Sequence, residues 1–280
     1  MESTFSPPIS SDNAVNRIQT KLDALRADTR KAFIAYVVAG DPDTQTTLAL
    51  MHEMVASGVD IIELGVPFSD PSAEGPVIQR AHERAVEAKV GLPQVFDIVK
   101  QFRDTDQVTP IVLMGYANPI EWMGYAEYSR QAAQVGVDGT LVVDIPPEEA
   151  AGINTALQAE GLYNVFLLAP TTTSARIQSI CNYASGFLYY VSLKGVTGSA
   201  AIAVDEVSAK LEEIRQHTAL PICVGFGIKD AATAAAVAKV SDGVVVGSAF
   251  VDAVARGAKE DAVSRAGVLA RGIREALDDA

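Results

Sequence analysis

The chain has 280 residues, of which 49% are hydrophobic, enough for one large hydrophobic core or two small ones. Its formal net charge of −13 excludes long-range attraction to nucleic acid or anionic lipid. No uninterrupted apolar run reaches the roughly 18 residues of a membrane-spanning helix, and the first residues contain no basic, apolar, cleavable signal. We therefore expect a cytoplasmic protein that binds neither nucleic acid nor membrane.

Cysteine and histidine are sparse and scattered. The five residues are Cys181, Cys223, His52, His82 and His217, and they show no metal-ligand spacing. We interpret all five as structural and expect no metal site.

The predicted elements begin after a polar leader, residues 1–13, which we expect to be flexible. Apolar residues at helical spacing follow over 14–27, and residues 32–40 form a predicted strand that stops at Gly40-Asp41-Pro42. Each later strand-like run is followed by helical periodicity. These runs cover 59–66, 110–116, 137–146, 162–170, 186–193, 220–227 and 242–249.

Eight strand-helix units in succession indicate parallel strands, because each right-handed crossover covers one face of the sheet. Eight units in about 250 residues predict a closed (β/α)₈ TIM barrel. We expect one barrel domain over 14–280, with the extra N-terminal helix closing its lower end. A doubly wound open sheet is the alternative, but its Gly-x-Gly-x-x-Gly turn is absent after the first strand.

The second predicted strand ends in a carboxylate. In "IIELGVPFSDPSAEGP", residues 61–76, the alternation of side chains sets Val59, Ile61 and Glu63 on one face. If Ile61 fills the barrel interior, Glu63 points into the barrel mouth, where apolar neighbours would raise its pKa and suit it to proton transfer. A structural Glu paired with an arginine or a backbone amide is the other interpretation.

The loop after this strand is long and rich in glycine and proline, as functional loops often are. Glu74 lies near its end, just before a predicted helix. It is either a site residue or an acid favoured by the dipole at the start of that helix.

The seventh and eighth strands end in "GFGI" and "VGSAF". Loops at these two barrel positions often hold a phosphate through backbone N–H groups. Gly227 and Gly247 would let an anion approach the backbone, and Ser248 adds a hydroxyl donor. Tight turns without a ligand are the alternative.

Polar and aromatic residues stand at other strand ends. The segment "SLKGVTGSAAIAVD" after the sixth strand, with Gly195 and Gly198 as hinges, is either a lid over substrate or an ordinary surface loop. Tyr116, Asp144 and Tyr189 are candidate pocket residues, although each could equally pack at the barrel rim.

Five motifs in one order resemble the α subunit of tryptophan synthase over residues 15 to 275. They are "ELGVPFSDPSAEGPVIQ", "VLMGYANP", "YYVSLKGVTG", "GFGI" and "VGSA". The resemblance implies a (β/α)₈ barrel that cleaves indole-3-glycerol phosphate to indole and glyceraldehyde 3-phosphate by a retro-aldol reaction. It implies no cofactor in this chain, and a partner β subunit, carrying pyridoxal phosphate, in an α2β2 complex.

The resemblance also implies residue roles. Glu63 matches the main acid/base, and Glu74 occupies the position of the second catalytic acid. The remaining matches are Tyr116, Tyr189 and Thr197 for substrate, Gly198, Gly227, Gly247 and Ser248 for phosphate, and Pro67 and Asp70 for the partner interface.

The chain departs from the family pattern at Glu74, where aspartate is usual in "DPxADGP". The longer side chain moves the carboxylate outward by roughly 1.5 Å, one C–C bond. A second, lesser departure is Lys194, where the family often has alanine. Two other functions therefore stay open: a catalytically weakened regulatory subunit, and another phosphate-binding barrel enzyme such as a sugar-phosphate isomerase.

Overall fold

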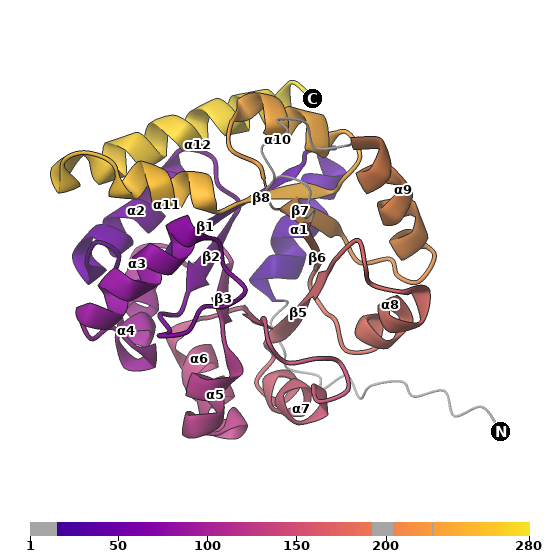
Figure 1. Ribbon diagram of the computed structural model, residues 1–280, viewed down its shortest axis with the longest axis horizontal. Coiled ribbons are helices and arrows are strands. Elements are labelled where there is room, and N and C mark those ends of the chain that lie inside the picture. The colour runs from indigo at the N-terminus through magenta and orange to yellow at the C-terminus, as the bar shows by residue number, and fades with distance from the viewer. Residues whose placement is uncertain (1–15, 192–203, 226) are drawn as a thin grey trace.

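The computed structural model describes residues 16–191, 204–225 and 227–280. Within these ranges eight parallel strands pair in sequence order, and the pairing of β1 with β8 closes the barrel. Figure 1 shows the helices arranged around this barrel. The closure confirms the TIM barrel and excludes the open sheet. The strands are β1 (Ala32–Val38), β2 (Ile61–Gly65), β3 (Ile111–Gly115), β4 (Gly139–Val142), β5 (Tyr163–Leu168), β6 (Leu188–Val191), β7 (Ile222–Gly225) and β8 (Gly243–Val246).

Helices follow each strand, and some connections hold two. They are α1 (Arg17–Ala27), α2 (Thr44–Ala56), α3 (Pro76–Glu87), α4 (Leu92–Arg103), α5 (Ala117–Met123), α6 (Tyr125–Val135), α7 (Ala151–Ala159), α8 (Ser174–Cys181), α9 (Val204–Arg215), α10 (Ala231–Ala238), α11 (Ser248–Ala255) and α12 (Ala262–Asp278), with a short 3₁₀ helix, η2 (Lys259–Asp261).

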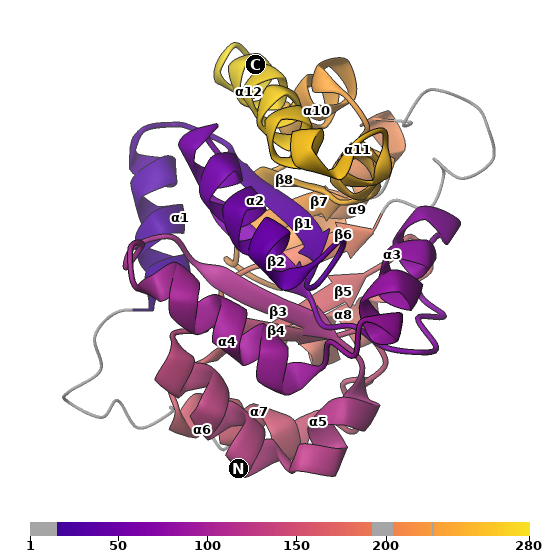
Figure 2. The same ribbon diagram turned by 90° about the vertical axis from the view of Figure 1, so that its left-hand side faces the viewer.

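Helix α1 precedes the first strand and closes the lower end of the barrel, as expected. Asn16 caps its first turn by accepting a hydrogen bond from the Ile18 N–H, and its Nδ2 donates to the Asp138 carbonyl at 2.8 Å. Arg17 adds an ion pair with the buried Asp138 carboxylate. In Figure 2 this helix lies on the left of the view, away from α3 on the right. The upper end of the barrel is left for the strand-to-helix loops.

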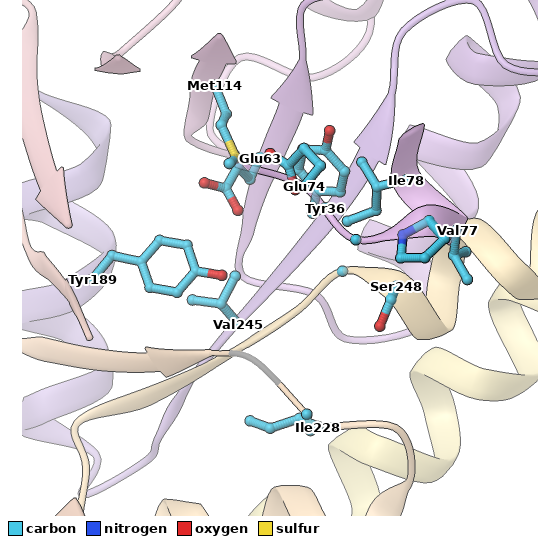
Figure 3. A pocket seen from close by; sticks show the side chains of 14 residues that line it. Tyr36, Glu63, Glu74, Val77, Ile78, Met114, Tyr189, Ile228, Val245 and Ser248 are labelled. Carbon is cyan, nitrogen blue, oxygen red and sulfur yellow. The ribbon is translucent and has the colours of Figure 1, made fainter. Parts of the chain in front are cut away.

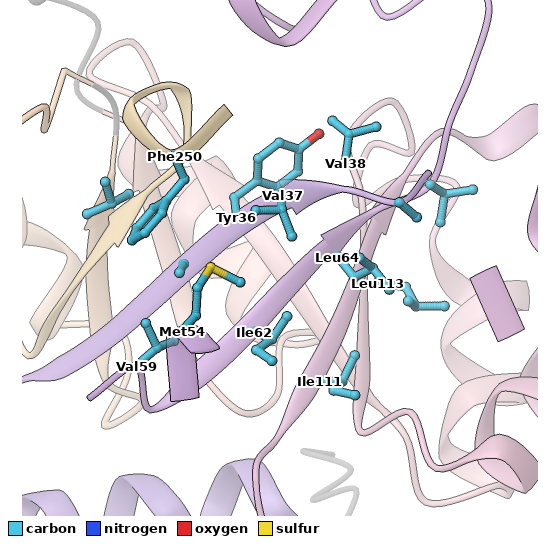
Figure 4. Close-up of a cluster of buried hydrophobic side chains, with 14 of the residues drawn as sticks. Tyr36, Val37, Val38, Met54, Val59, Ile62, Leu64, Ile111, Leu113 and Phe250 are labelled. Atoms are coloured by element: carbon cyan, nitrogen blue, oxygen red, sulfur yellow. The ribbon is translucent and has the colours of Figure 1, made fainter. Parts of the chain in front are cut away.

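The hydrophobic core has two layers. The barrel interior combines the buried face of α1 with inward-facing strand residues, and the outer layer fills the space between strands and helices. Figure 4 shows part of the outer layer around β1 and β2. The interior residues are Ile18, Leu22, Leu25, Ala32, Ile34, Ile61, Val112, Leu141, Val165, Phe187, Cys223 and Val245.

The predicted alternation along β2 holds for Ile61 and Glu63 and is wrong for Val59. Ile61 lies in the interior cluster, whereas Val59 packs in the outer layer. The reason is that β2 begins at Ile61, while the Val59 N–H still bonds to the Met54 carbonyl near the end of α2. A residue outside the strand does not follow its period of two.

The expected N-terminal leader, residues 1–13, lies outside the described residues. The division of the chain into this leader and one domain over 14–280 therefore stays a prediction. No helix in the described ranges is both long and apolar enough to cross a bilayer.

Candidate active site

A cavity of about 250 Å³ opens at the carboxyl ends of the strands. Figure 3 shows Glu63 and Tyr189 on one side of it and Ser248 on the other. Its lining is mainly apolar. Its polar groups include the carboxylates of Glu63 and Glu74, and the hydroxyl of Ser248 at the other end. The lining residues are Tyr36, Glu63, Glu74, Gly75, Pro76, Val77, Ile78, Met114, Tyr189, Gly227, Ile228, Val245, Gly247 and Ser248.

Glu63 carries a buried carboxyl group that has no counter-ion in the part of the chain that the structure describes. Its side chain is 2% exposed, and neither carboxylate oxygen has a hydrogen-bond partner among the described residues. Burial, and then the nearby negative charge of Glu74, raise the pKa of Glu63 from 4.5 to about 8. The lack of a hydrogen-bond partner among the described residues is inconsistent with a structural Glu paired to an arginine or amide. At neutral pH the group therefore holds a proton that it can give up.

Glu74 reaches the same cavity from the loop that joins β2 to α3. Burial raises the pKa of its carboxyl group from 4.5 to about 7. The helix α3 is capped by Gly75, without a side-chain capping bond. The backbone of Glu74 accepts from Gln79 Nε2 at 2.9 Å and donates to the Pro71 carbonyl at 3.1 Å. Its placement among the lining residues favours a site residue over a helix-start acid.

Two tyrosines line the cavity beside these acids, and each lies over a glycine. A side chain at Gly65 would come within 2.4 Å of the Tyr36 hydroxyl, and one at Gly225 within 2.4 Å of the Tyr189 hydroxyl. Burial raises the pKa of both phenols well above its usual range. Both tyrosines therefore stay protonated and can donate a hydrogen bond.

Tyr116 lies behind the cavity rather than among its lining residues. Its hydroxyl accepts a bond from the Ala73 N–H at 3.0 Å, and its ring stacks on Phe68 with 4.9 Å between centroids. It therefore fixes the loop next to Glu74, and its contact with substrate stays a prediction. Asp144 is exposed and accepts a bond from the Ala117 N–H at 2.8 Å, so it supports the start of α5.

Three of the predicted phosphate residues, Gly227, Gly247 and Ser248, line the other end of the cavity. Gly247 and Ser248 lie at the start of α11, and Gly227, with φ of +81°, follows β7. A Cβ at Gly247 would make van der Waals contacts with Tyr36 at 3.5 Å and Ile78 at 3.7 Å, and glycine leaves that part of the cavity wall without a side chain. An anion there would meet backbone N–H groups and the positive end of a helix dipole.

The other predicted residues divide by exposure. Pro67 is buried in the loop, whereas Asp70 is exposed. The expected lid lies outside the described residues, and so do Lys194, Thr197 and Gly198. Cys181 and Cys223 are free thiols, and no group of three potential metal ligands occurs in the described ranges.

Sequence reasoning missed several lining residues, among them Tyr36, Met114 and Val245. Tyr36 had a usable signal, because it lies two residues beyond the inward-facing Ile34, as Glu63 does beyond Ile61. Strand alternation gives no guide to loops and helix starts. Four further lining residues lie there: Pro76, Val77, Ile78 and Ile228.

Comparison with known proteins decides the family. The family model described as "Tryptophan synthase alpha chain" matches residues 22–277. The chain belongs to the tryptophan synthase α family. It is 55% identical over 266 residues to the tryptophan synthase alpha chain of Thioalkalivibrio sulfidiphilus, covering 94% of this chain and 100% of that one.

Solved structures of this family have the same fold. The tryptophan synthase subunit alpha of Legionella pneumophila superimposes with a TM-score of 0.90 at 45% identity, covering 95% of this chain and 100% of that chain. A chain of the tryptophan synthase complex of Pyrococcus furiosus gives a TM-score of 0.79 at 35% identity, with 87% and 98% covered.

Membership in the tryptophan synthase α family confirms the function expected from the motifs. The chain is a lyase that cleaves indole-3-glycerol phosphate in tryptophan biosynthesis. The α chain of this family carries no cofactor, and pyridoxal phosphate sits in the β subunit.

Proposed function

We propose that Glu63 carries the proton in this cleavage. The carbon that leaves as indole C3 must gain a proton, and the adjacent side-chain hydroxyl must lose one as it becomes the aldehyde. A carboxyl group that is protonated at neutral pH can first protonate C3 and then, as a carboxylate, accept the hydroxyl proton. The observation that carries this role is the buried Glu63 carboxyl group, which lies in an apolar cavity and has no hydrogen-bond partner within residues 16–191, 204–225 and 227–280.

Glu74 stabilises the charge that this protonation creates. When C3 is protonated, the ring nitrogen becomes electron-poor and its N–H acidic, so a carboxylate aimed at the N–H lowers the energy of the transition state. The lower pKa of Glu74, about 7 against about 8 for Glu63, supports this division of roles. One acid then holds the proton while the other is ionised.

Gly227, Gly247 and Ser248 bind the substrate phosphate at the opposite end. This contact lies away from the reacting carbon and so supplies binding energy that orients the substrate. Tyr189 contacts the indole part. The resemblance adds Tyr116, which lies behind the described cavity, and Thr197 and Gly198, which lie outside the described residues.

The partner is a tryptophan synthase β subunit, in an α2β2 complex in the cytoplasm. The similarity to a chain of the Pyrococcus furiosus tryptophan synthase complex supports this proposal. Asp70 is exposed on the β2 to α3 loop, and Trp122 is 89% exposed on α5, the helix that begins next to Tyr116. An exposed tryptophan is a frequent anchor of protein interfaces. The buried Pro67 shapes the loop from within.

The test is the products formed by the full chain, alone and with its β subunit. We expect indole and glyceraldehyde 3-phosphate in equal amounts from the isolated chain, and a higher rate in the complex. An isomerised sugar phosphate without indole would favour another barrel enzyme. Indole formation only in the complex would favour the regulatory subunit.

A further inference from the structure

His82 links the cavity wall to the loop that carries Glu74. It lies on α3, is 2% exposed, and uses both ring nitrogens: Nδ1 lies 3.1 Å from the Phe68 backbone N, and Nε2 lies 3.1 Å from the Tyr36 hydroxyl. From the sequence, we interpret this histidine as structural only. Neither contact is with a metal or an ion.

The partners of His82 fix its tautomer. A backbone N–H can only donate, so Nδ1 must carry no proton and must accept the bond from Phe68. The neutral ring then carries its proton on Nε2 and donates it to the Tyr36 oxygen. Burial lowers the pKa of His82 from 6.5 to about 4, so the ring stays neutral at physiological pH.

The Phe68 N–H bond is one of a small number of contacts that attach this loop to other described elements, and Gln79 Nε2 on α3 supplies another at the Glu74 carbonyl. The Val66 N–H bonds to the Met114 carbonyl at 2.8 Å, Phe68 stacks on Tyr116, and the Ala73 N–H bonds to the Tyr116 hydroxyl. Ala73 directly precedes Glu74. The loop is thus held at its start, at Phe68 and at its end.

We propose that His82 is a positioning residue for Glu74, acting through the Phe68 N–H bond that holds the β2 to α3 loop in its cavity-lining conformation. Its second bond holds the Tyr36 hydroxyl over Gly65, so the same imidazole fixes one wall of the cavity and the loop above it. This inference rests on the role of Glu74 proposed above.

Two conservative substitutions separate the two bonds of His82. Asparagine places an acceptor near the position of Nδ1 and lacks the Nε2 donor, whereas glutamine places a donor near Nε2 and lacks the Nδ1 acceptor. His82→Asn therefore keeps the Phe68 bond, and His82→Gln keeps only the Tyr36 bond. Tyr36→Phe removes the Tyr36 bond from the other side.

The experiment measures indole release across pH by the full chain with its β subunit. We expect His82→Gln to lower kcat at least tenfold with little change in KM, and His82→Asn to keep at least a third of wild-type kcat. In His82→Gln, the loss of Glu74 from the cavity should also move the alkaline limb of the profile, set by Glu63, to lower pH. A purely structural role would not move that limb.

Several outcomes would overturn the inference. One is wild-type kcat and an unshifted pH profile in folded His82→Gln. Another is an equal loss in His82→Gln and His82→Asn. If Glu74→Ala lowers activity but His82→Gln does not, only the inference on His82 fails. If Glu74→Ala has no effect, the proposed role of Glu74 fails first, and the inference fails with it.

Amide hydrogen exchange of the wild-type protein gives a test that needs no variant. The Phe68 N–H should exchange at least tenfold more slowly than an unstructured amide, because His82 accepts its bond. Exchange at the unstructured rate would contradict the attachment of the loop to His82.

Discussion

Tyr36 and Glu63 stand opposite each other in the register of β1 and β2, two residues beyond Ile34 and Ile61, which also pair. The lower pair fills the barrel interior and the upper pair lines the cavity. The same alternation that packs the barrel therefore delivers a phenol and a carboxyl group to its mouth. The apolar layer beneath Glu63 is also the cause of its raised pKa.

The pH dependence of kcat/KM should be bell-shaped. The active form has ionised Glu74 and protonated Glu63, so activity rises as pH passes about 7 and falls as pH passes about 8. Because the two groups interact, these values belong to the pair. Initial rates between pH 5.5 and 9.5 measure both limbs. A flat profile from pH 5.5 to 9.5 would contradict the assignment.

Glu63 should cost the protein stability at alkaline pH. Its folded pKa is raised from 4.5, so the folded state holds the proton more tightly, and stability falls as pH rises from about 4.5 to about 8. Glu63→Gln lacks this loss. Its free energy of unfolding relative to wild type should thus rise between pH 5 and pH 8.5 by at least about 1.4 kcal/mol, the equivalent of one pKa unit. Urea denaturation at the two pH values measures the change, and an equal difference at both would contradict it.

Gly247→Val should weaken phosphate binding. The valine side chain would lie over the Gly247 backbone against Tyr36 and Ile78, where the anion must approach, so affinity for glycerol phosphate should fall at least tenfold, about 1.4 kcal/mol. Gly272→Val on α12, away from the cavity, is the control for a glycine-to-valine change, because a Cβ there meets no atom within 4 Å. Calorimetric titration gives both affinities. Equal affinities in the two variants would remove Gly247 from the phosphate site.

Glu74→Asp tests the departure from the family pattern. Since Glu74 lines the cavity from its present loop, we expect the shorter aspartate to fall short of the indole N–H and kcat/KM to decrease. Steady-state kinetics beside Glu74→Ala measures this. Higher activity with aspartate would show that the loop has not adapted to glutamate, and alanine equal to glutamate would remove this residue from catalysis.

The barrel and the inward direction of Glu63 were predictable from sequence because both follow local rules, whereas the role of Glu74 came only from the resemblance. Eight repeated units predict the closed barrel, and the period of two predicts the inward direction of Glu63. The exact strand ends were not predictable. The run 137–146 forms a strand only over Gly139–Val142, and beyond it the Asp144 side chain accepts a bond from the Ala117 N–H at the start of α5.

The contacts between distant loops were also beyond sequence reasoning. Tyr116 was expected in the cavity wall and instead lies behind it, because its hydroxyl bonds to Ala73 on a loop 43 residues away. The pairing of His82 with Tyr36 and Phe68 depends likewise on how α3 packs over β1. Periodicity gives the direction of a side chain from its own strand but not its partner on another element.

The most direct test of the account is the turnover of Glu63→Gln in the complex with the β subunit. Proton transfer by a positioned group contributes about 10²- to 10⁴-fold to a rate, and glutamine neither gives nor takes the proton. We predict a loss of indole release of at least a hundredfold, with an unchanged circular dichroism spectrum and unchanged affinity for glycerol phosphate. Retention of more than a tenth of wild-type turnover would contradict the assignment of Glu63 as the proton carrier.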